Sequence, residues 1–246
     1  MTKNVNHVQS NDFLENVEKE KKELEESMKE SFRQRDERLK KEYNMAEKLT
    51  TQPLVRTLGT SIVKFNLPME LVDDINKAYD ENSENLKPHN DQLAGKIREE
   101  KKINKILTPD MQNTFLGYFK QYVNIKLTQP LKWNCILDQA WINEMKSGEY
   151  NPIHYHTSKN SEVGLSSVLM LKRPDWYGIE ASKEEAPANG WLEFTGGDQS
   201  VFSTSQVRVD AQVGEFYVFP YTLLHGVYPF NSTDQVRRTM SYNCDL

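Results

Sequence analysis

The 246-residue sequence has very little cysteine. Its two cysteines, Cys135 and Cys244, do not form a C-x-x-C pair, which excludes a disulfide framework and a cysteine-rich zinc module. A single disulfide between them stays open, although a reducing compartment is the simpler interpretation. Any metal site in this chain must therefore be built from histidines and carboxylates.

Long apolar runs and an excess of basic residues are also missing. No stretch approaches the ~18 apolar residues of a membrane span, and the N-terminus lacks the charged-then-apolar order of an export signal. We therefore expect a cytoplasmic protein without a membrane partner. The net charge of −5 and the isoelectric point near 5.7 argue against a general basic surface for nucleic acid.

The first 50 residues form a charged extension that has no glycine or proline after residue 11. Glu, Lys and Arg dominate it, and its apolar residues follow helical spacing, which predicts one long helix. The stripe is interrupted at Lys21, Ser31 and Arg35, so the sequence allows a coiled coil but does not establish one. The helix could be an oligomerisation or docking arm that makes a homo-oligomer, or a solvated helix laid against the domain. The stripe consists of Leu14, Val17, Leu24, Met28, Phe32, Leu39, Tyr43, Ala46 and Leu49.

Residues 51–130 predict a strand and supporting helices. The β-rich segment Ser61–Phe65 is expected to be the first strand. A helix should open at Leu67-Pro68 and run to about residue 79, and a second should follow Thr108-Pro109-Asp110. His89 stands in a polar segment between them and is expected on the surface.

Residues 131–246 change to short β-rich runs separated by turn residues. Even spacing of short strands predicts an all-β sandwich, barrel or jelly roll, here with helices covering one face. The long polar segment 173–190 is either a substrate-facing loop or a variable excursion. The eight expected strands are 131–147, 152–157, 163–172, 190–195, 199–208, 215–220, 225–229 and 236–243.

Three histidines are the candidate metal ligands. His154 and His156 lie at i and i+2 of an expected strand, so both side chains point to one face and can reach one ion. Such a pair can also simply lie on a half-buried strand, so a third group is needed. His225 in a later β-rich run supplies it. Three nitrogens on one side of an ion leave the other side open, as catalytic sites require.

The last expected strand carries a polar face. Period two places Arg237 with Thr239, Ser241 and Asn243 on that face, and Arg238, Met240 and Tyr242 on the other. A buried guanidinium needs an anionic partner. That partner is either a carboxylate cosubstrate or an Asp or Glu of the protein.

Taken together, these motifs resemble the 2-oxoglutarate/Fe(II)-dependent oxygenases, in particular those found in phages and bacteria. The resemblance spans about 60–246 and is carried by G-E-Y-N-P-x-H-x-H at 148–156, L-S-S-V-L at 165–169, G-E-F-Y-V-F-P at 214–220, His225, and R-x-T-x-S-x-N at 237–243. It implies a double-stranded β-helix core, ferrous iron, 2-oxoglutarate and dioxygen as cosubstrates, and hydroxylation of an unidentified substrate. A phage origin would place the protein in the host cytoplasm.

The resemblance also assigns residues. His154 and His225 match the family's two histidine ligands, and Arg237 matches the arginine that binds the distal carboxylate of 2-oxoglutarate, with Thr239 as its hydroxyl helper. Asn143 could donate to the same cosubstrate, or be a satisfied amide of the core.

His156 is where this chain departs from the family pattern, which has Asp or Glu two residues after the first histidine. The chain would then hold its metal with three histidines, raising the net charge at the ion by one unit. Alternatively, Glu149, Glu162 or Asp138 supplies a carboxylate ligand. One histidine of the pair would then contact a metal ligand and not the metal itself.

Two other functions compete. A zinc hydrolase or lyase could use the same three histidines, although no general base is evident beside them. A non-catalytic β-helix binding or assembly module is the other alternative.

Overall fold

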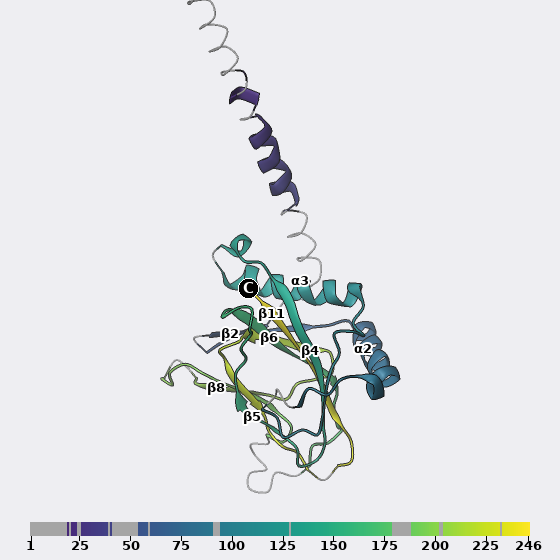
Figure 1. The fold of residues 1–246 in the computed structure, drawn as a ribbon. Coiled ribbons are helices and arrows are strands. Elements are labelled where there is room, and N and C mark those ends of the chain that lie inside the picture. The colour runs from purple at the N-terminus through teal and green to yellow at the C-terminus, as the bar shows by residue number, and fades with distance from the viewer. Residues whose placement is uncertain are drawn as a thin grey trace, which may run out of the picture. The chain divides into compact units, whose positions relative to one another are not determined.

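The computed structural model describes residues 19, 21–23, 26–38, 40, 54–58, 60–90, 94–127, 129–178, 188–201, 204–231 and 233–246 (Figure 1). The chain divides into two compact units, Met1–Lys48 and Leu49–Leu246, and each is treated by itself. Within the described ranges, no helix combines the length and the apolar character needed to cross a membrane.

In the first unit, all described residues from 19 to 40 are helical and exposed, as the sequence predicts for this part. Of the expected apolar stripe, only Met28 and Phe32 lie among these residues, and both are about half exposed. The other stripe positions lie outside the described residues.

The second unit contains two antiparallel sheets. The seven-stranded sheet has the order β1-β2-β9-β6-β11-β4-β3, and the four-stranded sheet has the order β5-β10-β7-β8. The strands are β1 Leu54–Leu58, β2 Thr60–Asn66, β3 Glu99–Lys102, β4 Ile136–Met145, β5 Asn151–His154, β6 Gly164–Lys172, β7 Leu192–Thr195, β8 Gln206–Val209, β9 Glu215–Pro220, β10 Leu224–Val227 and β11 Arg237–Asp245. All eight strands expected after residue 131 are present, although β4 and β8 begin later than predicted. The prediction that Ser61–Phe65 is the first strand is wrong, because β1 precedes it and pairs with it.

Two helices cover the large sheet on the side away from β5 and β8 (Figure 1). These are α2, Met69–Asn82, and α3, Pro109–Lys126, and single 3-10 turns lie at Ser83–Asn85 and Pro130–Lys132. At the start of α3 the Thr108 side chain accepts a hydrogen bond from the Met111 amide. Both helices are where the sequence predicts them, with α2 extending three residues further.

The large sheet is buried on both faces. Its helix side packs on α2 and α3 through a core that includes Phe115, Phe119 and Tyr242. Its other side packs on the small sheet through a second core that includes Phe194 and Phe219. Every residue of β11 is therefore buried, and the polar face of this strand lies between the two sheets.

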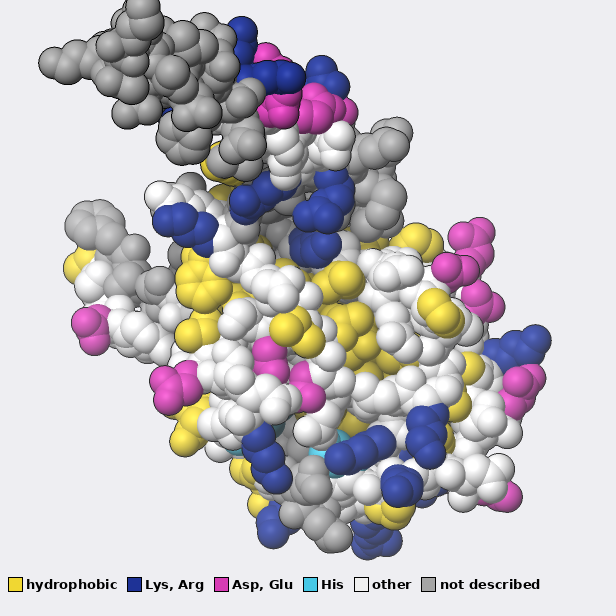
Figure 2. Space-filling view, turned by 45° about the horizontal axis from the view of Figure 1, so that its top comes forward, with side chains coloured by type: hydrophobic (Ala, Val, Ile, Leu, Met, Phe, Trp, Pro, Cys, Tyr) yellow, Lys and Arg dark blue, Asp and Glu magenta, His cyan; other side chains and the backbone are white. Residues whose placement is uncertain are grey.

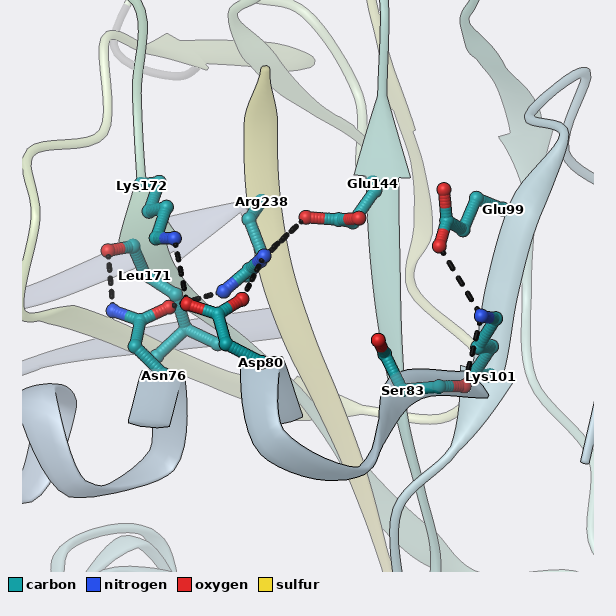
Figure 3. Close-up of polar contacts among 9 residues, drawn as sticks. All are labelled: Asn76, Asp80, Ser83, Glu99, Lys101, Glu144, Leu171, Lys172 and Arg238. Carbon is teal, nitrogen blue, oxygen red and sulfur yellow. Dashed lines mark hydrogen bonds and ion pairs between the residues drawn. The ribbon is translucent and has the colours of Figure 1, made fainter. Parts of the chain in front are cut away.

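Arg238 joins α2 to the large sheet (Figure 3). Its guanidinium donates to Glu144 on β4 at 2.6 Å and to Asp80 and Asn76 on α2 at 2.7 and 3.0 Å. It also lies 4.6 Å from the ring centroid of Tyr79. This buried arginine has protein carboxylates as partners, so the helix side of β11 needs no ligand.

The prediction of a surface position for His89 is wrong. The side chain is only 4% exposed, and its ring packs edge-on against Trp141 at 5.3 Å. Its backbone amide bonds to the carbonyl of Glu100 on β3, a strand that the sequence did not predict. Burial, followed by the charge of Lys102, lowers the pKa of His89 to about 4.

Candidate metal centre

The three histidines come together on the small sheet. His154 on β5 and His225 on β10 are direct partners in the antiparallel register, so their side chains lie next to each other on the same face. His156 follows β5 by two residues and is held there by a hydrogen bond from its amide to the carbonyl of Tyr221, 2.9 Å long. The period-two argument from the sequence is confirmed.

The ring nitrogens are close enough to hold one ion. The Nε2 atoms of His156 and His225 are 3.1 Å apart, and one ring nitrogen of each of the three residues lies within 4.8 Å of the others. The ring centroids of His154 and His225 are 4.3 Å apart. Such spacing is expected where three imidazoles converge on one small cation.

Backbone carbonyls determine which nitrogen can bind a metal. Nδ1 of His154 lies 2.7 Å from the carbonyl of Pro152, and Nδ1 of His225 lies 2.9 Å from that of Leu223. A carbonyl oxygen can only accept, so both Nδ1 atoms carry the proton. Nε2 of each ring then has a free electron pair, and the carbonyls fix the ring orientation as the outer partners of metal-binding histidines do.

Burial keeps these imidazoles neutral. It lowers the pKa of His154, lowers that of His156 to about 3, and lowers that of His225 well below its ordinary value. The neighbouring histidines add to the last two shifts. Neutral imidazole is the form that coordinates a metal. The rings need not be deprotonated before an ion binds near pH 7.

A pocket opens beside the three histidines. In Figure 2, histidine side chains appear only as small cyan areas among lysines and arginines, in agreement with their burial. Aromatic rings support the site, with Trp141 5.7 Å from His156 and Phe219 4.6 Å from His225. The pocket is lined by Ala94, Trp141, Asn143, Asn151, His154, His156, Val168, Leu192, His225, Val227, Thr239 and Ser241.

No carboxylate joins the cluster among the residues that the structure describes. Glu149 accepts hydrogen bonds from the amides of Arg98 and Lys146, one at each oxygen. Asp138 and Glu162 do not line the pocket either. The alternative in which one of these three supplies a ligand therefore has no support in the geometry.

Arg237 is buried without an acidic partner. It is 2% exposed, and its Nε donates to the carbonyl of Gly190 at 2.9 Å. Its second terminal nitrogen, Nη2, has no hydrogen-bond partner, and within the described ranges no carboxylate lies within 4.0 Å of the guanidinium. The alternative of an Asp or Glu partner is thus not observed.

Tyr177 is a residue that the sequence did not single out. Its hydroxyl lies next to the Arg237 guanidinium and is buried without an acceptor for its proton. Its ring packs on Gly190, where a Cβ would come within 2.4 Å of it. Both ends of the expected loop 173–190 therefore meet beside Arg237, while 179–187 lie outside the described residues. Only the W-Y-G run of that loop could have suggested an ordered aromatic residue.

Thr239 and Asn143 are direct partners across β11 and β4, and both line the pocket. The Oδ1 atom of Asn143 is buried and unpaired, so this amide is not the satisfied core group that was the alternative. Trp141 and Asn151, in the same lining, were not predicted as site residues.

Residues 139–243 match the model of a family described as "Putative 2OG-Fe(II) oxygenase". No curated protein sequence matches the chain. Three similar solved structures show its fold. A prolyl-4-hydroxylase of Pseudomonas putida is 16% identical, with 75% of this chain and 91% of that chain covered and a TM-score of 0.50. AviO1 of Streptomyces viridochromogenes is 13% identical, with 76% and 90% covered and a TM-score of 0.51.

The third is a prolyl hydroxylase of Trichoplax adhaerens in complex with a hypoxia inducible factor peptide. It is 11% identical to this chain, and the match covers 85% of this chain and 92% of that chain with a TM-score of 0.51. The resemblance seen in the motifs is thereby confirmed. Residues 139–243 thus match the 2OG-Fe(II) oxygenases, the dioxygenases that use ferrous iron and 2-oxoglutarate.

Proposed function

We propose that this protein hydroxylates its substrate with a ferrous ion held by His154, His156 and His225 and with 2-oxoglutarate held by Arg237. The two sheets would form the double-stranded β-helix of the family. The observation that carries the proposal is the convergence of three neutral imidazoles next to a pocket, with an unpaired buried guanidinium on the neighbouring sheet.

The donor set fits ferrous iron. Imidazole nitrogen is a suitable ligand for Fe(II), and three of them leave positions for a bidentate cosubstrate and dioxygen. Ferrous iron with three neutral ligands keeps its charge of +2, which the dianion 2-oxoglutarate would neutralise. A carboxylate in place of His156 would hold the cation more tightly and the dianion less tightly.

Arg237 and Tyr177 fit the distal carboxylate of 2-oxoglutarate. Each presents a buried donor that lacks a partner, and leaving such donors empty costs about 1–3 kcal/mol each. A carboxylate would accept from both. Thr239 and Asn143 line the pocket between this anchor and the histidines and would fix the orientation of the cosubstrate.

The bound iron would supply the activation of dioxygen. The protein would orient the cosubstrate and exclude water from the site. Val168, Leu192 and Val227 form the apolar part of the pocket wall and limit water at the metal. The carbonyl contacts at the Nδ1 atoms keep two rings in the tautomer whose Nε2 atom would bind the metal.

An anaerobic titration with Fe(II) and 2-oxoglutarate tests this proposal through the visible charge-transfer band of the chelate. Arg237→Ala should weaken 2-oxoglutarate binding by about 10- to 100-fold, the loss expected for charged hydrogen bonds worth 1.5–3 kcal/mol. The matched control Arg208→Ala removes an arginine that pairs with Glu193 outside the pocket and should leave the band unchanged. Absence of the band in wild type would refute the proposal.

The same band decides the role of His156. His156→Ala should abolish or shift the band, and His156→Asp should restore metal binding with a different band position. An unchanged band in His156→Ala would remove this residue from the ligands.

The zinc alternative requires a general base, and no carboxylate joins the histidine cluster among the described residues. Neither it nor the non-catalytic module is favoured by the family match.

We also propose that the N-terminal helix mediates homo-oligomerisation, because Met28 and Phe32 are exposed on it. Light scattering of the full chain against a Met28→Glu, Phe32→Glu variant tests this. Equal masses at monomer size would reject it.

A further inference from the structure

A second group of buried polar atoms without partners belongs to two residues that line the pocket and to one on the strand beside them. It consists of Oε1 of Glu100 and the Oδ1 atoms of Asn143 and Asn151. Glu100 is 1% exposed. All three atoms are acceptors as placed, whereas the unpaired atoms of Arg237 and Tyr177 are donors. A partner of the first three residues must therefore donate hydrogen bonds, whereas a partner of Arg237 and Tyr177 must accept them.

Strand register places Glu100 beside the pocket wall. On β3, Glu100 is the direct partner of Asn143 on β4, which in turn faces Thr239 on β11. Side chains of direct partners point to the same face of a sheet, so Glu100 continues the row of pocket residues by one strand. Its neighbour Glu99 points to the opposite face, where it pairs with Lys101 (Figure 3).

Gly95 lets the side chains of Glu100 and Asn151 approach the backbone closely. A Cβ on this glycine would lie 2.9 Å from Oε1 of Glu100 and 3.5 Å from Oδ1 of Asn151. Ala94 and Asn151, on either side, both line the pocket. The two oxygens therefore lie on the same side of Gly95, near enough for one ammonium group to contact both, and a side chain at residue 95 would crowd them.

Glu100 differs from the neighbouring buried carboxylate. Both oxygens of Glu149 accept backbone hydrogen bonds, whereas Glu100 has only a 3.3 Å contact from Asn90 to its other oxygen, Oε2. A structural carboxylate is normally saturated in this way. An unsaturated one beside a pocket, together with two unpaired amide oxygens, is better explained by a group that arrives with donors.

We propose that Glu100, Asn143 and Asn151 form a subsite for a cationic group of the substrate, a primary ammonium or a guanidinium. An ammonium has three donors for three acceptors, and its charge matches the carboxylate. This deepens the proposed function, on which it rests, by naming the substrate class as an amine or guanidine. Burial and the nearby Glu149 raise the pKa of Glu100 to about 7, so a cationic guest would also hold this carboxyl ionised.

The probe is agmatine, which carries both cationic groups, with n-butanol as the uncharged comparison. Calorimetry at pH 8 under anaerobic conditions, with Fe(II) and 2-oxoglutarate bound, should show agmatine binding at least 10-fold tighter than butanol. Glu100→Gln removes the charge and keeps the shape, and it should weaken agmatine by about 10- to 100-fold. Gly95→Ala places a methyl group 2.9 Å from Oε1 of Glu100 and should weaken agmatine binding similarly. The backbone at residue 95 has a conformation that alanine also adopts.

Glu99→Gln is the matched control, on the same strand but the opposite face, and should bind agmatine as wild type does. Equal affinity of wild type for agmatine and butanol, or full agmatine affinity in Glu100→Gln, would overturn the subsite. It would mean that a water or a rotated asparagine amide satisfies these oxygens.

The chelate band separates this outcome from failure of the proposed function. Glu100→Gln and Gly95→Ala should both retain the band, since neither residue belongs to the cluster of His154, His156 and His225. If wild type gives no band, the agmatine titration is repeated on the metal-free protein, where discrimination against Glu100→Gln still reports on the subsite alone.

Discussion

Glu100→Gln should change how stability depends on pH. The carboxyl has a pKa of about 7 in the folded protein against an ordinary value of 4.5, because burial penalises its charge. A difference of about 2.5 units corresponds to about 3 kcal/mol. Between these two values the folded state binds more protons than the unfolded state, so this group makes the protein less stable as pH rises from 4.5 through 7.

His89 acts in the opposite direction. Its pKa is lowered from 6.5 to about 4, so the unfolded state binds more protons in that interval and stability is lost as pH falls below 6.5. The two residues are connected through the amide of His89 and the carbonyl of Glu100. Their contributions are of similar size, so they largely cancel in wild type between pH 4.5 and 6.5.

The assay is urea unfolding of wild type and Glu100→Gln at several pH values from 4.5 to 8. The variant should match wild type near pH 4.5, gain up to about 3 kcal/mol relative to it above pH 7, and lose stability more steeply on acidification. Glu99→Gln should follow the wild-type profile. A stability difference that does not depend on pH, or one that falls as pH rises, would refute the reasoning.

Three further outcomes are expected. Arg238→Met should destabilise the fold by about 3–5 kcal/mol in urea unfolding, because two acidic side chains lose their buried partner; a loss below 1 kcal/mol would contradict this. Tyr177→Phe should weaken 2-oxoglutarate binding by roughly 10-fold without changing Fe(II) affinity, as measured by titration of the chelate band; unchanged cosubstrate affinity would remove the hydroxyl from the site. His89→Phe should make thermal stability less sensitive to acid between pH 6.5 and 4, and an unchanged acid limb would contradict the lowered pKa.

Local pattern predicted most of the β core and the histidine cluster. His154 and His225 are direct cross-strand partners, and the i and i+2 spacing of His154 and His156 was sufficient to place both rings on one face. The same argument separated Arg237 from Arg238 on β11, since neighbouring residues of a strand must face opposite sides.

Pairing between distant segments accounts for what the sequence missed. The β3 segment reads E-E-K-K, which has no apolar alternation, so neither the strand nor the burial of His89 against it could be predicted. Tyr177 reaches Arg237 from a loop whose path no periodicity describes. Whether a buried side chain has a partner also depends on such contacts, which is why the unpaired oxygen of Glu100 had no signal in the sequence.

The two adjacent arginines of β11 have a consequence for register. They are chemically identical, yet Arg238 meets Asp80 and Glu144 on one face, and Arg237 meets no acidic side chain described on the other. A slip of the strand by one residue would move every side chain to the other face. Arg238 would then point into the pocket and Arg237 toward α2. The acidic pair thus selects which arginine is left for a ligand, and it does so without touching that ligand.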